Sequence, residues 1–174
     1  MWLRDVVVPG RFFRDRRDAG RVLAEALEKY RVRDPLVLGI PRGGVVVAAE
    51  VARRLGAEVD VLVARKLGAP GQPELAIGAV TADGGRWLNG ALVSSLAVDA
   101  GYIDDVTRAE MAEAHARQTR FRGVRPPPEI EGRVVILVDD GFATGATVRA
   151  AARALRRKRP ARLVLAAPVG APET

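Results

Sequence analysis

The segment that most constrains the fold lies near the C-terminus, where an apolar run leads into two acids and a Gly/Thr-rich turn. Residues 134–138 are five consecutive apolar residues, mostly β-branched, and the run is too short for a helix. Residues 146–158 are dominated by Ala, Leu and Arg, which favour a helix. A strand buried on both faces and followed by a helix is typical of an α/β fold. It places Asp139 and Asp140 at the carboxyl end of the strand.

The rest of the chain alternates helix and strand in the same way. Such strand–helix–strand units form a parallel sheet with right-handed crossovers, and ligands bind at the carboxyl ends of its strands. We therefore predict a single domain over residues 1–174, with a parallel twisted sheet flanked by helices and a hairpin/helix insertion that forms a flexible loop and a partial hood. Helices are expected at residues 17–30, 44–55, 104–120 and 146–158, strands at 35–40, 59–64, 134–138 and 162–167, and a hairpin around 83–85.

The turn after the two acids suits a phosphate attached to a sugar. N–H groups at the start of a helix have no intrahelical partner and lie at the positive end of its dipole, and the hydroxyls of Thr144 and Thr147 add donors. Two carboxylates would disfavour a bare phosphate, whereas the hydroxyls of a ribose 5-phosphate can donate to Asp139 and Asp140. The alternative is a strand–turn–helix with a solvated acidic corner. A P-loop fits less well because no Gly-Lys-Ser/Thr ends the turn.

The run Val-Asp-Asp-Gly-Phe-Ala-Thr-Gly-Ala-Thr at residues 138–147 resembles the phosphoribosyl pyrophosphate (PRPP) motif of the type I phosphoribosyltransferases. The resemblance implies the core fold of that family and a pentosyltransferase of nucleotide metabolism that moves ribose 5-phosphate from PRPP to a nitrogenous base. It makes Asp139 and Asp140 catalytic residues that hold the ribose hydroxyls. It also implies Mg²⁺, held mainly by substrate oxygens near the two acids. The implied 5-phosphate loop is Ala143, Thr144, Gly145, Ala146 and Thr147.

A second small-residue turn, Pro41-Arg42-Gly43-Gly44, follows the predicted strand at residues 35–40. Taken alone, it is most simply an ordinary turn with Arg42 in solvent. The resembled family has a diphosphate-binding loop at this position, often built around a cis peptide that is not prolyl. The resemblance thus implies that Arg42, Gly43 and Gly44 bind diphosphate. A cis bond, if present, is expected at residues 41–42 or 42–43.

The strand at residues 59–64 is followed by Arg65, Lys66 and a Gly/Pro-rich stretch. The pair is similar to the loop that covers the diphosphate in adenine- and orotate-type members, which implies diphosphate binding by both residues and a catalytic role for Lys66. The alternative is a solvated basic turn. We expect residues 68–75 to be poorly ordered without ligand. Ala143 stands where hypoxanthine-type members carry an aspartate, so a general acid or base must come from elsewhere, and Glu74 is a candidate.

Composition sets limits on partners and location. The chain has a net charge of +7 and no cysteine, which excludes disulfides and thiolate chemistry. The basic clusters are most simply solvated helix ends, so nucleic acid is not an expected partner. An alternative function remains open, namely a catalytically silent regulator that senses PRPP or a nucleotide and binds nucleic acid. The sequence shows no membrane span and no secretory signal, so we expect a cytoplasmic protein. A homodimer is compatible with the sequence.

Overall fold

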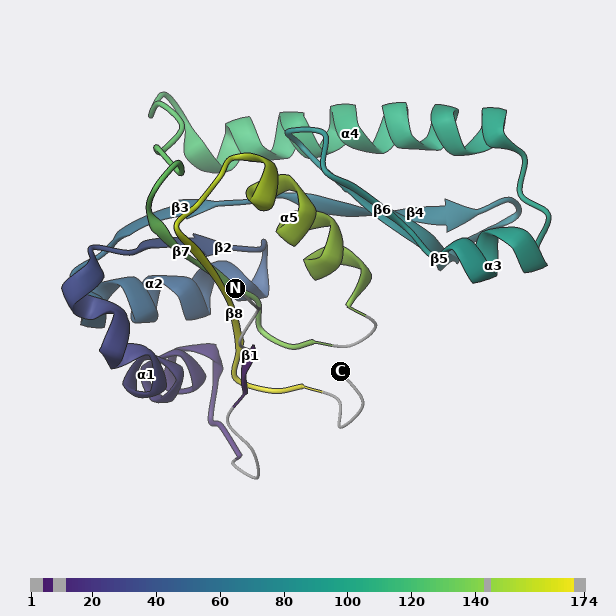
Figure 1. The fold of residues 1–174 in the computed structure, drawn as a ribbon. Coiled ribbons are helices and arrows are strands. Elements are labelled where there is room, and N and C mark those ends of the chain that lie inside the picture. Colours follow the sequence, from purple (N-terminus) through teal and green to yellow (C-terminus); the bar gives the residue numbers. More distant parts are fainter. Residues whose placement is uncertain (1–4, 8–11, 143–144, 171–174) are drawn as a thin grey trace. The chain divides into compact units, whose positions relative to one another are not determined.

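The computed structural model describes residues 5–7, 12–142 and 145–170, and the chain divides into two compact units. The first unit comprises Met1–Leu62, Arg125–Ala143 and Lys158–Thr174, and the second comprises Val63–Val124 and Thr144–Arg157. Figure 1 labels the elements of both units along the chain. That residues 1–174 form a single domain stays a prediction.

The first unit contains a five-stranded sheet with the strand order β1-β8-β7-β2-β3. Every assigned strand pair in it is parallel, as the sequence predicted. The central strand β7 and its neighbour β8 have the predicted bounds. The strands are β1 (Asp5–Val7), β2 (Leu36–Gly39), β3 (Glu58–Val61), β7 (Val134–Val138) and β8 (Arg162–Ala167), and the helices are α1 (Arg16–Leu27), the 3₁₀ helix η1 (Glu28–Arg33) and α2 (Gly43–Leu55).

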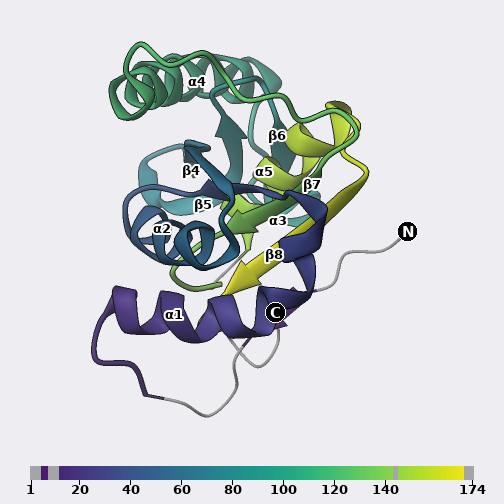
Figure 2. The ribbon, with the colours of Figure 1, turned by 90° about the vertical axis from the view of Figure 1, so that its left-hand side faces the viewer.

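Helices α1 and α2 lie side by side and bury their apolar faces against the sheet of the first unit (Figure 2). Leu23, Val47 and Ile136 from α1, α2 and β7 are each fully buried in this core. Gly20 lets the two helices approach, because a Cβ there would lie 2.8 Å from the Cβ of Glu50. This close packing fixes where α1 begins relative to the sheet.

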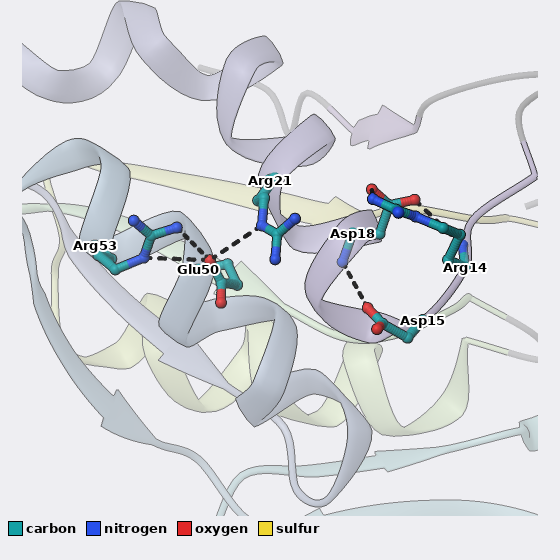
Figure 3. Close-up of polar contacts among 6 residues, drawn as sticks. All are labelled: Arg14, Asp15, Asp18, Arg21, Glu50 and Arg53. Carbon is teal, nitrogen blue, oxygen red and sulfur yellow. Dashed lines mark hydrogen bonds and ion pairs between the residues drawn. The ribbon is translucent and has the colours of Figure 1, made fainter.

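Polar contacts support the same two helices (Figure 3). The Asp15 side chain caps α1 by accepting a hydrogen bond of 2.8 Å from the Asp18 N–H. The Glu50 carboxylate on α2 accepts hydrogen bonds from Arg53 of the same helix and forms an ion pair with Arg21 of α1. The cap defines the first residue of α1 as Arg16.

The second unit contains the antiparallel sheet β4-β5-β6 with helices on both faces. Ala79 on β5 is buried against Ala146 and Ala150, whereas the next residue, Val80, is buried in the cluster that contains Ile103. Successive strand residues point to opposite faces, so α5 and α4 cover opposite faces of this sheet. The elements are β4 (Ala64–Ala69), β5 (Gln72–Thr81), β6 (Arg86–Leu88), α3 (Gly90–Ser95), α4 (Ala100–Arg122) and α5 (Ala146–Arg157).

One prediction about this region is wrong. The strand expected at residues 59–64 is split, because β3 ends at Val61 and pairs in the parallel sheet, whereas β4 begins at Ala64 in the antiparallel one. Residues 68–75 include a β-hairpin, in which Ala69 pairs with Gln72 around Pro70 and Gly71, and their poor order without ligand stays a prediction. Pro followed by a residue with positive φ suits a tight turn, and φ of Gly71 is +70°.

The remaining predictions for short elements had mixed outcomes. The hairpin expected around residues 83–85 is confirmed by the antiparallel pairing of β5 with β6. Strand β1 and helix α3 were not predicted, because they are three and six residues long and carry little periodicity. The helix expected at residues 17–30 is α1 only as far as Leu27, and the 3₁₀ helix η1 follows it. Within the described ranges, every helix is too short or too polar to cross a bilayer.

Candidate functional site

Two of the predicted site segments follow neighbouring strands of the parallel sheet. Strands β2 and β7 pair in register from Leu36 opposite Val135 to Gly39 opposite Val138. Beyond this pairing, the Ile40 N–H donates to the Val138 carbonyl at 2.9 Å. The turn at residues 41–44 and the acidic pair therefore emerge at the same edge of the first unit.

The glycines of this turn lie directly against the two acids. A Cβ at Gly43 would overlap the carboxylate of Asp140. At Gly44, a Cβ would lie 2.8 Å from the Val138 carbonyl oxygen and 3.2 Å from Oδ1 of Asp139. Because real Cβ atoms do not approach other atoms this closely, only glycine at both positions allows the turn and the acids to meet.

The turn also has the backbone features expected of it. The Pro41–Arg42 bond is cis, which is one of the two positions predicted. Arg42 is the N-cap of α2, its side chain is exposed, and no side chain caps this helix start within the described structure. The first-turn N–H groups of α2 are therefore not used by a capping side chain.

The acidic pair has an unusual electrostatic environment. The pKa of Asp139 is raised from its ordinary value to about 6, mainly by burial and in smaller part by the charge of Asp140. A hydrogen bond of 2.9 Å, donated by the Asp140 N–H to Oδ1 of Asp139, opposes this effect and lowers the pKa. At neutral pH the Asp139 carboxyl is therefore mostly ionised, and mild acid protonates it.

Arg16 reaches this site from α1, and the sequence analysis missed it. Its Nε donates to Oδ2 of Asp140 at 2.8 Å across 124 positions of sequence. The residue belongs to the basic cluster at residues 14–17, which from sequence alone is most simply a solvated helix end. No local pattern identifies such a contact, because it depends on where α1 packs.

The predicted 5-phosphate loop is described only in part. Ala143 and Thr144 lie outside the described residues. Gly145 has a φ of +71°, and helix α5 begins at Ala146, so Thr147 lies in its first turn. The predicted start of this helix is confirmed, and the role of its residues in phosphate binding stays a prediction.

The basic pair at the start of β4 has two different environments in the second unit. Arg65 lies on the same face of the strand as Leu67, which is buried in the cluster with Ile103 of α4. The Arg65 Nε donates to Oε2 of Glu110 on α4 at 2.5 Å, and its side chain is 27% exposed. Lys66 points to the opposite face and is exposed, as is Glu74 on β5. Arg65 thus has a structural partner, whereas Lys66 is open to solvent.

The structure therefore brings Gly43, Gly44, Asp139 and Asp140 together within the first unit. Arg65, Lys66, Glu74 and Thr147 belong to the second unit. Carboxylate oxygens such as those of the acidic pair are ligands that Mg²⁺ prefers. Among the side chains that the structure describes, no group of three or more His, Cys, Asp or Glu could hold a metal ion.

Comparison with known proteins identifies the family. Residues 15–174 match the family model of the phosphoribosyl transferase domain, and the chain belongs to this family. A Mycobacterium tuberculosis H37Rv protein, provisionally named a phosphoribosyl transferase, is 48% identical over 160 residues, which are 92% of this chain and 36% of that protein. The chain therefore spans about a third of the length of this relative.

Solved structures agree with the fold. The Thermus thermophilus protein TT1426 is 48% identical, with a TM-score of 0.77, and the match covers 94% of this chain and 77% of that one. A purine phosphoribosyltransferase from Pyrococcus horikoshii has a TM-score of 0.56 at 16% identity, over 98% of this chain and 80% of that one. The second likeness shows the fold alone.

Proposed function

We propose that the protein transfers ribose 5-phosphate from PRPP to a nitrogenous base and releases diphosphate in a Mg²⁺-dependent reaction. The observation that carries this proposal is the contact of the acidic pair, Asp139 and Asp140, with the Gly43–Gly44 turn at one edge of the sheet. Acceptors for sugar hydroxyls and backbone donors for a diphosphate are thereby combined in one place. Membership of the phosphoribosyl transferase domain family supports the same chemistry.

In this proposal the two acids bind the ribose ring. Their carboxylates accept hydrogen bonds from the 2- and 3-hydroxyls and stabilise the positive charge that develops on the ring as the bond to diphosphate breaks. With a pKa of about 6, Asp139 carries most of its negative charge at neutral pH. Mg²⁺, when bound, neutralises the diphosphate and is held largely by substrate oxygens near the acids.

The remaining residues would bind the charged ends of the substrate. Arg42 and the N–H groups of Gly43 and Gly44 bind the diphosphate, because the start of α2 offers donors and the positive end of a helix dipole. The exposed Lys66 stabilises the departing diphosphate. Glu74, which is exposed on β5, is the proposed general acid or base. Arg65 is proposed as a second contact to the diphosphate. The proposed 5-phosphate loop is Ala143, Thr144, Gly145, Ala146 and Thr147.

A nucleobase screen tests the proposal. The protein is incubated with PRPP, Mg²⁺ and each base in turn, and diphosphate release is measured. We expect release with at least one base, and loss of it in the Lys66→Ala variant and in the double variant Asp139→Asn/Asp140→Asn. The control is Glu25→Gln, an exposed acid on α1.

Calorimetry with PRPP and Mg²⁺ separates the alternatives. No binding by the wild-type protein, or binding unchanged in the double variant, would reject the proposed site. PRPP binding without turnover on any base, together with salt-sensitive binding of nucleic acid, would favour a regulator over an enzyme.

A further inference from the structure

The side chain of Arg16 lies against the turn and the acid to which the proposed function assigns the substrate. Its Nε is 2.8 Å from Oδ2 of Asp140, and a Cβ built on Gly43 would lie 2.7 Å from the same Nε. The guanidinium therefore lies over the first residue of α2, between the predicted diphosphate turn and the predicted ribose acid. Three segments meet at this point: the start of α1, the turn before α2 and the end of β7.

The neighbours of Arg16 on α1 do not share this position. Arg14 pairs locally, since its side chain lies 3.6 Å from Asp18 and its N–H donates to the same carboxylate (Figure 3). Arg17 is exposed and forms no ion pair with any residue in the described ranges. Because Asp15 caps the helix, Arg16 is its first residue, and only Arg16 of these three reaches Asp140.

The pairing of Arg16 with Asp140 leaves the guanidinium largely unused. A guanidinium has five N–H donors, and within the described structure only Nε has a side-chain partner. The Arg16 side chain is 61% exposed and that of Asp140 is 35% exposed, and ion pairs this open to water are weak. The planar donor fork matches phosphate oxygens better than a single carboxylate oxygen does.

We propose that Arg16 is a further diphosphate-binding residue and that Asp140 is its partner when the site is empty. When PRPP binds, Asp140 accepts from a ribose hydroxyl, and the Arg16 guanidinium turns to the diphosphate oxygens beside Gly43. In both states the Arg16 guanidinium and the Asp140 carboxylate each have a hydrogen-bond partner. This inference rests on the proposed function, because it assigns a residue to the same substrate.

Calorimetry with three ligands tests the inference: PRPP, inorganic diphosphate and ribose 5-phosphate, each with Mg²⁺. For Arg16→Gln we expect a loss of about tenfold or more in affinity for PRPP and diphosphate, as befits a charge-assisted contact. Affinity for ribose 5-phosphate should be unchanged or higher, because Asp140 is released from its partner. Arg16→Lys should recover part of the loss, and the control Arg17→Gln should behave as the wild type.

Two results would overturn the inference while leaving the proposed function intact. One is a wild-type protein that binds PRPP while Arg16→Gln weakens diphosphate binding no more than Arg17→Gln does. The other is an equal loss for ribose 5-phosphate and diphosphate, which would indicate a general structural defect; thermal melting of each variant checks for this. A wild-type protein that binds none of the three ligands would overturn the inference and the proposed function together.

Discussion

Two Pro/Gly turns of this chain look alike in sequence and differ in what surrounds them. The turn at residues 41–44 in the first unit lies against the acidic pair, so that a Cβ on Gly43 or Gly44 would meet Asp140 or Asp139. The turn at residues 70–71 in the second unit closes a hairpin, and a Cβ on Gly71 would meet no atom within 4 Å. The composition of a turn therefore does not reveal whether its glycines make room for a site or for a bend in the backbone.

The largest expected effect comes from Gly43→Ala. The added methyl group would displace the Asp140 carboxylate, which is also the hydrogen-bond partner of Arg16. We expect PRPP affinity to fall about 100-fold or more. Each factor of ten corresponds to a loss of roughly 1.4 kcal/mol in binding free energy. Titration calorimetry with PRPP and Mg²⁺ measures this. Affinity within a few-fold of the wild type would remove the contrast between the two turns.

Gly68→Ala should destabilise the hairpin formed by β4 and β5. A Cβ at Gly68 would lie 2.7 Å from both Cα and the carbonyl oxygen of Pro73, and this backbone cannot move without disturbing the pairing of β4 with β5. We expect the free energy of unfolding to fall by about 2 kcal/mol, as measured in urea. The matched control is Gly71→Ala, where open space leaves only the strain of a positive φ, about 1 kcal/mol. Equal losses in both variants would show that contact with Pro73 is not the cause.

The third prediction concerns the stability cost of the acidic pair. The pKa of Asp139 is raised in the folded state, so the folded chain binds more protons than the unfolded chain between about pH 4 and pH 6. Stability contributed by this group is therefore lost as pH rises through that window. Asp139→Asn removes the effect and can still accept the hydrogen bond from the Asp140 N–H.

We expect Asp139→Asn to be no more stable than the wild type at pH 4 and more stable by about 1–2 kcal/mol at pH 7, after discounting for partial solvent exposure. Urea denaturation at several pH values measures the difference, with Glu25→Gln as the control. A difference that does not change with pH would contradict the raised pKa.

The smallest effect is expected for Glu110→Gln. This change weakens the ion pair with the half-buried Arg65, and we expect a loss of about 1 kcal/mol in unfolding free energy. A double-mutant cycle with Arg65→Gln measures the coupling. If Arg65 instead acts mainly on the diphosphate, Arg65→Gln will weaken PRPP binding as strongly as Lys66→Ala does.

The sequence alone determined the central strand β7 of the parallel sheet, its neighbour β8 and the start of helix α5. Strands β7 and β8 have the bounds that their apolar runs predicted, and α5 begins at the predicted Ala146. These elements are readable because a strand buried on both faces must be uniformly apolar, and because Ala, Leu and Arg favour a helix locally. The split between β3 and β4 was not readable, since the residues at 59–64 carry no signal for which strand each half will pair with.

The candidate site divides in the same way. The acidic pair was singled out from its place after a predicted strand, whereas the Gly43–Gly44 turn became a site candidate through the family resemblance. That the two meet follows from the carboxyl ends of parallel strands lying at one edge. Only the tertiary structure decided that Arg16 pairs with Asp140 and Arg65 with Glu110, and that burial raises the pKa of Asp139. Those features depend on contacts across 45 to 124 positions of sequence and on the exclusion of water. Both arise from packing, which local residue patterns do not encode.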